Sequence, residues 1–309
     1  MEEPMDDRRH IGTVLVATDF SEGSERAIEW ATEVARAHGA RIVLAHGLLP
    51  IGPMVAAPEA IPVPPEIYEE DRKRCAAELV KRAESLRAGG ARVETHLGEG
   101  MPSRVIVDAA DKLGADLVVA GTRGQTGWRR VFLGSTAAEI VRGARCPVLT
   151  VHPEHVRSNQ PIQHILVPTD YSEDAMQALR AAVGILAPAA AGARVTLLHA
   201  FRLQAGAVYP WAASTLAYRA NELARESVER LEQIAEPIRR LGFDVQTTAR
   251  EGYPPQVIDE EASRLRVDLI AMGTHGRSGL KRLVLGSVAE RILPNAPCPV
   301  VTVHTEEKR

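Results

Sequence analysis

Aromatic residues are scarce in this 309-residue chain, at 4%, so its core must be built from alanine, valine, leucine and isoleucine. No apolar run approaches the roughly 18 residues that a membrane helix needs. The opening residues, MEEPMDDRRH, have mixed charge, whereas a signal peptide begins basic and then turns apolar. These absences exclude a membrane span in the sequence given, and we expect a cytoplasmic protein.

Cysteine and net charge are also low. Three cysteines give no disulfide framework, and none of them forms a cysteine–histidine cluster with zinc spacing. Cys146 and Cys298 each precede a proline and are expected to be buried and inert, which makes Cys75 the most reactive candidate. The net charge of −3 argues against nucleic-acid binding by electrostatics.

Two common nucleotide motifs are missing as well. The chain has no Gly-x4-Gly-Lys-Ser/Thr loop, so the lysine and hydroxyl of P-loop enzymes are absent. No Gly-x-Gly-x-x-Gly follows the first predicted strand, which excludes the dinucleotide fingerprint. We find no general base or arginine finger beside the glycine-rich segments, and phosphoryl transfer depends on such groups. We therefore assign no catalytic residue and no metal ligand.

One glycine-rich segment occurs twice. Residues 121–135 read GTRGQTGWRRVFLGS and residues 273–287 read GTHGRSGLKRLVLGS. Each follows a short apolar run, DLVVA or DLIAM, and leads into a second apolar segment and then a Cys-Pro pair. A strand, a glycine-rich loop and a helix start, in that order, form a site for an anionic group.

The repeat extends over the whole chain. Asp170 follows Asp19 by 151 residues, and Cys298 follows Cys146 by 152. This steady offset predicts a duplicated domain, with a first domain at 1–153, a second at 160–309 and a polar linker at 154–159. Domains of about 150 residues can each bury a core of their own.

Strand and helix patterns alternate within each half. In the first half we predict strands near residues 12–18, 41–46, 91–97, 116–120 and 147–151, with helices between them. Alternation of this kind favours an α/β fold with a parallel sheet and helices on both faces. In the second half, Pro237 predicts that the long helix from about residue 216 kinks or ends near Glu236.

The glycine segments fit the spacing Gly-x2-Gly-x9-Gly-Ser. Together with VLVATD and ILVPTD at the ends of the first strands, this pattern resembles the universal stress protein family, in its tandem two-domain, ATP-binding form. The resemblance implies two Rossmann-like open sandwiches, each a five-stranded parallel sheet in the order 3-2-1-4-5. It also implies ATP at the carboxyl ends of the strands, which agrees with the general rule for open α/β sheets.

The resemblance also implies site residues. Asp19 and Asp170 would contact adenosine, although each could instead cap the following helix, where Ser21 and Ser172 are already available. Main-chain groups at Gly47 and Ala200 would meet adenine. The predicted phosphate contacts, which could also be ordinary turn glycines and capping serines, are Gly121, Gly124, Gly134, Ser135 and Thr136 in the first half and Gly273, Gly276, Gly286, Ser287 and Val288 in the second.

The two predicted sites are not identical. Ala17 stands where the second half has Pro168, and Ala120 stands where it has Met272. We expect the first site to hold adenosine more loosely. Basic residues in the x9 segments could neutralise a triphosphate or could be ordinary surface charge. His46 and His199, at matching strand ends, are expected to be packing residues.

The leading interpretation is an ATP-binding stress-response regulator with little or no turnover, acting on an unknown protein partner. Whether magnesium accompanies the nucleotide stays open. The alternatives are a slow ATPase or phosphotransferase, and a ligand carrier whose apolar loops at 47–64 and 202–215 bind something else. The last strand of each half is a predicted sheet edge. These edges could pair within the chain as a pseudo-dimer, and a homodimer is possible.

Overall fold

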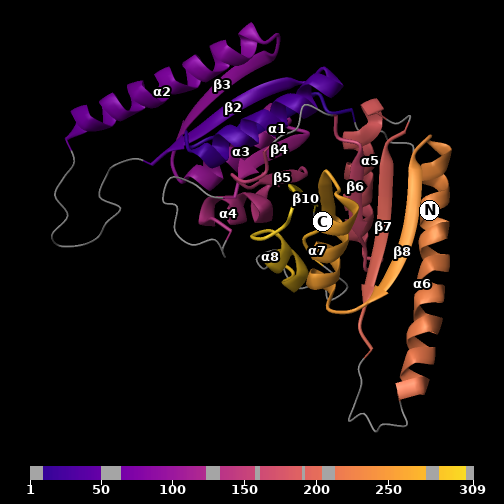
Figure 1. Ribbon diagram of the computed structural model, residues 1–309. Coiled ribbons are helices and arrows are strands. Elements are labelled where there is room, and N and C mark those ends of the chain that lie inside the picture. Colours follow the sequence, from indigo (N-terminus) through magenta and orange to yellow (C-terminus); the bar gives the residue numbers. More distant parts are fainter. Residues whose placement is uncertain are drawn as a thin grey trace, which may run out of the picture. The chain divides into compact units, whose positions relative to one another are not determined.

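The computed structural model describes residues 10–49, 64–122, 133–156, 161–189, 192–203, 213–275 and 285–303. The chain divides into two compact units, one at residues Ile11–Arg157 and one that contains Ser158–Arg309. Figure 1 shows strands and helices alternating along each unit.

The first unit is a parallel α/β sandwich. Its strands, in the order β3-β2-β1-β4-β5, pair in parallel throughout. Its elements are β1 (Thr13–Ala17), α1 (Glu22–His38), β2 (Arg41–Leu48), α2 (Pro65–Ala88), β3 (Arg92–Glu99), α3 (Pro102–Leu113), β4 (Leu117–Gly121), α4 (Ser135–Gly143) and β5 (Val148–Val151). The predicted strand order 3-2-1-4-5 is confirmed in this unit.

Right-handed crossovers decide where these helices lie. Connections that run from β1 towards β3 place α1 and α2 on one face, and those that run towards β5 place α3 and α4 on the other. The contacts agree, since Arg82 on α2 donates to Glu25 on α1 at 2.6 Å and α3 packs on α4. The central strands β1 and β4 are therefore covered on both faces and are almost wholly buried.

The second unit repeats this architecture. Its strands lie in the order β10-β9-β6-β7-β8, and the described pairings are parallel. Its elements are β6 (His164–Pro168), α5 (Glu173–Leu186), a 3₁₀ turn η1 (Ala187–Ala189), β7 (Arg194–Phe201), α6 (Ala213–Arg240), β8 (Asp244–Glu251), α7 (Pro254–Leu265), β9 (Leu269–Gly273), α8 (Ser287–Ile292) and β10 (Val300–Val303).

Local sequence sets the ends of the helices. The side chain of Ser21 caps α1 by accepting from the Ser24 N–H, and Gly39 ends this helix in the left-handed region at φ 63°. Ser172 caps α5 in the same way. The predicted caps Ser21 and Ser172 are therefore confirmed, whereas Ser135 and Ser287 do not cap their helices, since Gly134 and Gly286 are the N-caps. Pro102 and Pro254 occupy the first turns of α3 and α7, where a missing N–H costs nothing.

Of the two predicted effects of Pro237, an end of α6 near Glu236 is wrong, and a kink there stays a prediction. The helix continues through Pro237 to Arg240. Leu231, Ala235 and Ile238 are fully buried on the side of this helix that packs on β7 and β8. Burial of this apolar face on both sides of the proline outweighs the loss of one backbone hydrogen bond.

Candidate functional site

The first unit contains a cavity of about 410 Å³ at the carboxyl ends of its central strands. It opens where the strand order reverses between β1 and β4, which is the usual ligand position in open α/β sheets. The ends of β1, β2 and β4 line it together with the starts of α1, α3 and α4. The lining residues are Ala17, Thr18, Asp19, Ser24, His46, Gly47, Pro102, Ile106, Ala120, Gly121, Thr122, Gly134, Ser135, Thr136, Ala137 and Ile140.

The structure brings most of the predicted first-half residues together. All of those that lie in the described part of the chain line this one cavity, namely Asp19, Gly47, Gly121, Gly134, Ser135 and Thr136. Gly124 lies outside the described residues. Residues as far apart in the sequence as Asp19 and Thr136 therefore share one pocket, although their contacts with a ligand stay a prediction.

Asp19 does not cap the following helix. Ser21 provides the cap, and Asp19 Oδ1 accepts from the Ser21 N–H at 3.1 Å and from its hydroxyl at 2.5 Å. In the second unit, Asp170 Oδ1 accepts from the Ser172 N–H at 3.0 Å. These contacts hold both carboxylates in place at the ends of β1 and β6, where each lines a cavity.

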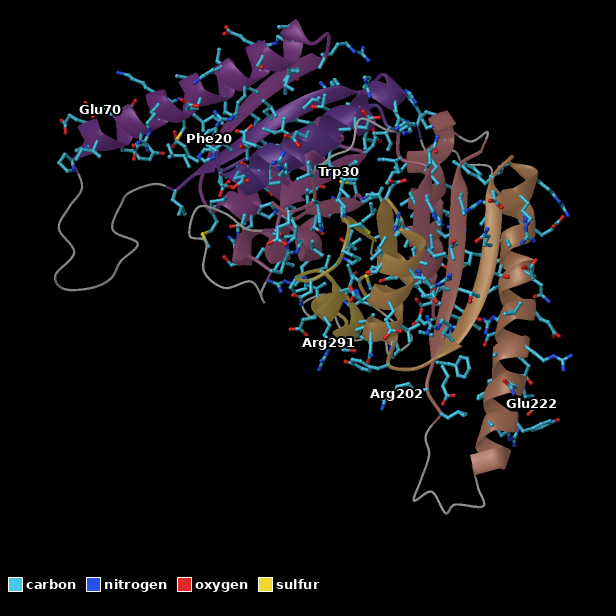
Figure 2. All side chains as sticks on the ribbon, in the orientation of Figure 1. Phe20, Trp30, Glu70, Arg202, Glu222 and Arg291 are labelled. Carbon is cyan, nitrogen blue, oxygen red and sulfur yellow. The ribbon has the colours of Figure 1, made fainter. Side chains whose placement is uncertain are left out.

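The matching histidines are packed and fixed by hydrogen bonds. His46 Nδ1 lies 2.7 Å from the Thr18 carbonyl, and His199 Nδ1 lies 2.7 Å from the Thr169 carbonyl. A carbonyl oxygen can only accept, so Nδ1 carries the proton in each ring. Phe20, labelled in Figure 2, stacks on His46 with ring centroids 4.6 Å apart. The structure thus shows packing contacts for both histidines.

Two features of the first cavity favour a polar ligand. Thr122 is almost fully buried and lines the cavity, and its hydroxyl has no hydrogen-bond partner within the described part of the protein. Buried hydroxyls usually have a partner, so this one needs an explanation. Gly134 is the N-cap of α4 and offers no side-chain acceptor, so the first N–H groups of this helix are available to an anion.

Gly121 is required by packing as much as by any ligand. A Cβ atom there would lie 2.9 Å from the backbone carbon and oxygen of Gly23 in α1. Gly273 approaches α5 in the same way, since its Cβ would lie 2.7 Å from the Asp174 Cβ. The close approach of strand end to helix start explains these glycines, so their presence alone does not indicate a phosphate.

The second unit has an equivalent but smaller cavity of about 210 Å³. Asp170, Ala200, Gly273, Gly286, Ser287 and Val288 all line it, as predicted from the sequence, and Gly276 lies outside the described residues. Met272 stands where the first cavity has Ala120 and Val288 where it has Thr136, which makes the second cavity narrower and more apolar.

A carboxylate that sequence reasoning missed lies beside the glycine loop of the second unit, next to the lining residue Ala175. Asp174 is buried, and its Oδ2 accepts from the His275 backbone N–H at 3.2 Å and lies 3.4 Å from His275 Nδ1. The Thr274 hydroxyl lies 3.0 Å from the same ring nitrogen. In the first unit the position of Asp174 is occupied by Gly23. Comparison of the two halves could have revealed this difference.

Two arginines lie against the Tyr253 ring, directly before α7, one of the helices that line the second cavity. Arg202 and Arg291, labelled in Figure 2, place their guanidinium carbons 5.6 and 5.4 Å from the centre of the Tyr253 ring. Tyr253 immediately precedes Pro254, a lining residue, and is half-exposed. Two positive charges thus lie beside the ends of β7 and β8. The first unit has Leu49, Met101 and Glu139 at the equivalent positions.

That Cys75 is the most reactive thiol stays a prediction, because burial raises the pKa of all three cysteines. Cys75 is buried against the sheet, and this burial raises its pKa. Burial also raises the pKa of Cys146 to about 12 and raises that of Cys298, as expected for inert thiols. Within the described ranges, no cluster of three or more histidine, cysteine or acidic side chains could hold a metal ion. None of the described helices is long and apolar enough to cross a membrane.

Other predicted features lie outside the described residues. These are residues 123–132 and 276–284, which include most of each basic x9 segment, and most of the two apolar loops, at 50–63 and 204–212. Sequence reasoning also missed the start of α3, where Pro102 and Ile106 line the first cavity, and of α7, where Pro254 and Ile258 line the second. The repeat of Pro-x3-Ile at an offset of 152 (254 − 102) was the available signal.

Comparison with known proteins identifies the same family in both halves. The model of the universal stress protein family matches residues 10–152 and again 161–304. A universal stress protein from Mycolicibacterium smegmatis is 29% identical over 297 residues, which cover 94% of this chain and 96% of that protein. The crystal structure of a universal stress protein from Archaeoglobus fulgidus, 20% identical, has a TM-score of 0.69 and covers 94% of this chain and 98% of that one. A solved universal stress protein in complex with cAMP is 29% identical, covers 47% of this chain and 99% of that one, and has a TM-score of 0.35.

Proposed function

Because this chain belongs to the universal stress protein family, with one family domain in each half, we propose that it binds an adenine nucleotide in each of its two cavities. We further propose that nucleotide occupancy regulates an interaction with a protein partner and that turnover is slow or absent. ATP is the nucleotide we propose for the first cavity.

One observation carries this proposal. In each unit, six residues that the family resemblance implies as site residues line one cavity at the carboxyl ends of the strands. The first cavity, at about 410 Å³, has a volume in the roughly 300–1,000 Å³ range of small-molecule pockets. A structural repeat alone would not require a cavity at the same place in both units.

The first cavity has suitable groups for each part of a nucleotide. Asp19 offers carboxylate oxygens, which can only accept, to the hydroxyl donors of a ribose. Gly47 offers main chain to the base without a side chain in the way. The start of α4 at Ser135 offers N–H groups and a favourable dipole to phosphates.

Slow turnover is proposed because the titratable groups of this cavity are engaged. Among its described lining residues these groups are Asp19 and His46. Asp19 accepts from Ser21, and the Nδ1 proton of His46 is directed to the Thr18 carbonyl. Phosphoryl transfer needs groups positioned on the nucleophile and on the developing charge. We propose that magnesium, where present, comes with the triphosphate.

The test begins with the purified full-length protein. Heat denaturation followed by chromatography measures any nucleotide that the protein retains, and calorimetric titration of nucleotide-free protein measures stoichiometry and affinity for adenosine, AMP and ATP. We expect two adenine-ligand sites per chain. Asp19→Ala and Asp170→Ala should each remove one of them, because each deletes the carboxylate of one cavity.

Glu70→Ala is the matched control, since it removes an exposed carboxylate from α2 and should leave both sites intact (Figure 2). Absence of bound nucleotide after purification, together with no heat of binding for any of the three ligands, would refute the proposal. Retention mainly of ADP would favour the slow-ATPase alternative.

A further inference from the structure

The two units differ at the turn that faces the glycine loop, where Asp174 stands in the second unit and Gly23 in the first. We propose that Asp174 makes the second cavity selective for an adenine nucleoside or its monophosphate, whereas the first cavity accepts the triphosphate. This inference rests on the proposed adenine-nucleotide binding and specifies the ligand of each site.

In the second unit, the protein itself occupies one backbone N–H donor of the loop after β9. In the glycine loops of this fold, backbone N–H groups are the anion-binding elements. In the second unit the N–H of His275, in the loop after β9, donates to Asp174 Oδ2 at 3.2 Å. An anion that needs this donor would have to displace a carboxylate that belongs to the protein.

Asp174 also places a carboxylate beside the loop after β9. Asp174 is buried, with a relative exposure of 8%, so its charge is poorly screened by solvent. Like charges in such surroundings repel strongly, and a triphosphate brings several negative charges to the same loop. The first unit has Gly23 at this position, and the two carboxylates in the first turn of α1, Glu22 and Glu25, are not buried.

The second cavity also has less room for a ligand than the first. The second cavity, at about 210 Å³, has half the volume of the first and falls below the usual range of roughly 300 Å³ or more for small-molecule pockets. Met272 and Val288 replace the smaller or more polar Ala120 and Thr136. This shape suits a compact ligand with an apolar ring, because it offers more apolar contact and less room for a phosphate chain.

The experiment isolates each cavity in the full chain. With Asp19→Ala, only the second cavity binds, and titrations at about pH 8, above the ordinary range of histidine titration, should show adenosine and AMP binding at least about tenfold more tightly than ATP. With Asp170→Ala, only the first cavity binds, and ATP should bind at least as tightly as adenosine.

Reciprocal exchange then tests the residue itself. In the Asp19→Ala protein, adding Asp174→Asn removes the charge but keeps the size of the side chain, and should tighten ATP binding about tenfold with little change for adenosine. Asp174→Gly, which copies the first unit, should do the same. In the Asp170→Ala protein, Gly23→Asp should weaken ATP binding and leave adenosine binding as the control for a folded pocket.

The outcomes separate the two proposals. If neither cavity binds any adenine ligand, the proposed function fails. If both cavities bind ATP and adenosine with equal preference, the proposed function stands and the selectivity of the second cavity is refuted. A gain of ATP affinity with Asp174→Gly but none with Asp174→Asn would overturn the argument from charge.

Discussion

Asp116 provides a quantitative test of how the first unit holds its central strand. It follows α3, and its Oδ2 accepts from the backbone N–H groups of Gly12 and Thr13, at 2.8 and 2.9 Å. These donors lie at the start of β1, which ends at the first cavity. Asp116→Ala removes both bonds and leaves the two N–H groups without this acceptor.

The size of the effect follows from the bonds lost. A hydrogen bond to a charged group contributes about 1.5–3 kcal/mol net. The Gly12 bond is exposed to solvent, so both bonds together should contribute about 2–4 kcal/mol to the free energy of unfolding. Asp116→Asn keeps an oxygen acceptor and should cost about 1 kcal/mol.

Hydrogen exchange measured by mass spectrometry is the assay, because it reports on each unit separately. A loss of 2–4 kcal/mol corresponds to roughly 30- to 700-fold faster exchange of those β1 amides that exchange through unfolding of the unit. The second unit contains a matched control. Asp268 Oδ2 accepts from the N–H groups of Gln163 and His164, both at 2.9 Å, so Asp268→Ala should accelerate exchange in β6 but not in β1.

The reasoning would be refuted by an Asp116→Ala protein whose β1 peptides exchange at the wild-type rate. It would also be refuted if Asp116→Asn were as damaging as Asp116→Ala, because the loss would then come from charge alone and not from the two hydrogen bonds.

Three further predictions concern single side chains. Burial raises the pKa of Glu261, but hydrogen bonds from Arg264 and Arg250 outweigh this effect and hold the pKa below its usual value. The carboxylate therefore contributes stability above the unfolded-state pKa of about 4.3, and this stability is lost as pH falls through the lowered folded-state pKa. Glu261→Gln should flatten the acid side of a plot of unfolding midpoint against pH. Burial raises the pKa of Cys75, so iodoacetamide should alkylate it far more slowly in the native protein than in urea, as measured by mass spectrometry; equal rates would contradict its burial. Gly47→Ala would place a Cβ atom 2.5 Å from the Pro102 Cα, so it should cost about 1–3 kcal/mol of stability and reduce ligand binding in the first cavity alone, whereas unchanged calorimetry would show that the pocket adapts.

Much of the fold was predictable because its determinants are local and occur twice. Buried parallel strands appear as short apolar runs, and the capping serines Ser21 and Ser172 stand directly before their helices. The strand order was not deducible from these patterns and came from the family resemblance. The helix end predicted at Pro237 was wrong. Proline locally opposes helix formation, whereas the buried face of α6 is a tertiary contribution that the sequence of one segment does not show.

The predictable part of the candidate site consists of the glycine-rich segments and the aspartates at the strand ends. The volume of each cavity was not predictable, because it depends on which side chains meet at the carboxyl ends of the strands. The Asp174–His275 contact joins α5 to the loop after β9, residues that are 101 positions apart. A sequence pattern that inspects each motif separately cannot detect such a contact, although aligning the two halves places Asp174 opposite Gly23.

The duplication within the chain separates supporting residues from residues that select a ligand. Identical pairs have the same internal contacts in both units: Asp116 and Asp268 hold the first strands, and His46 and His199 donate to the carbonyls at the ends of those strands. These pairs keep the edge of each sheet in one geometry.

Four of the pairs that differ lie at or beside the cavities: Gly23 and Asp174, Gly47 and Ala200, Ala120 and Met272, Thr136 and Val288. Substitutions that narrow one cavity and add a carboxylate beside its loop change the free energy of binding a polyphosphate while leaving the sheet that supports the site unchanged. These four differences support the proposal that the two units respond to different adenine ligands.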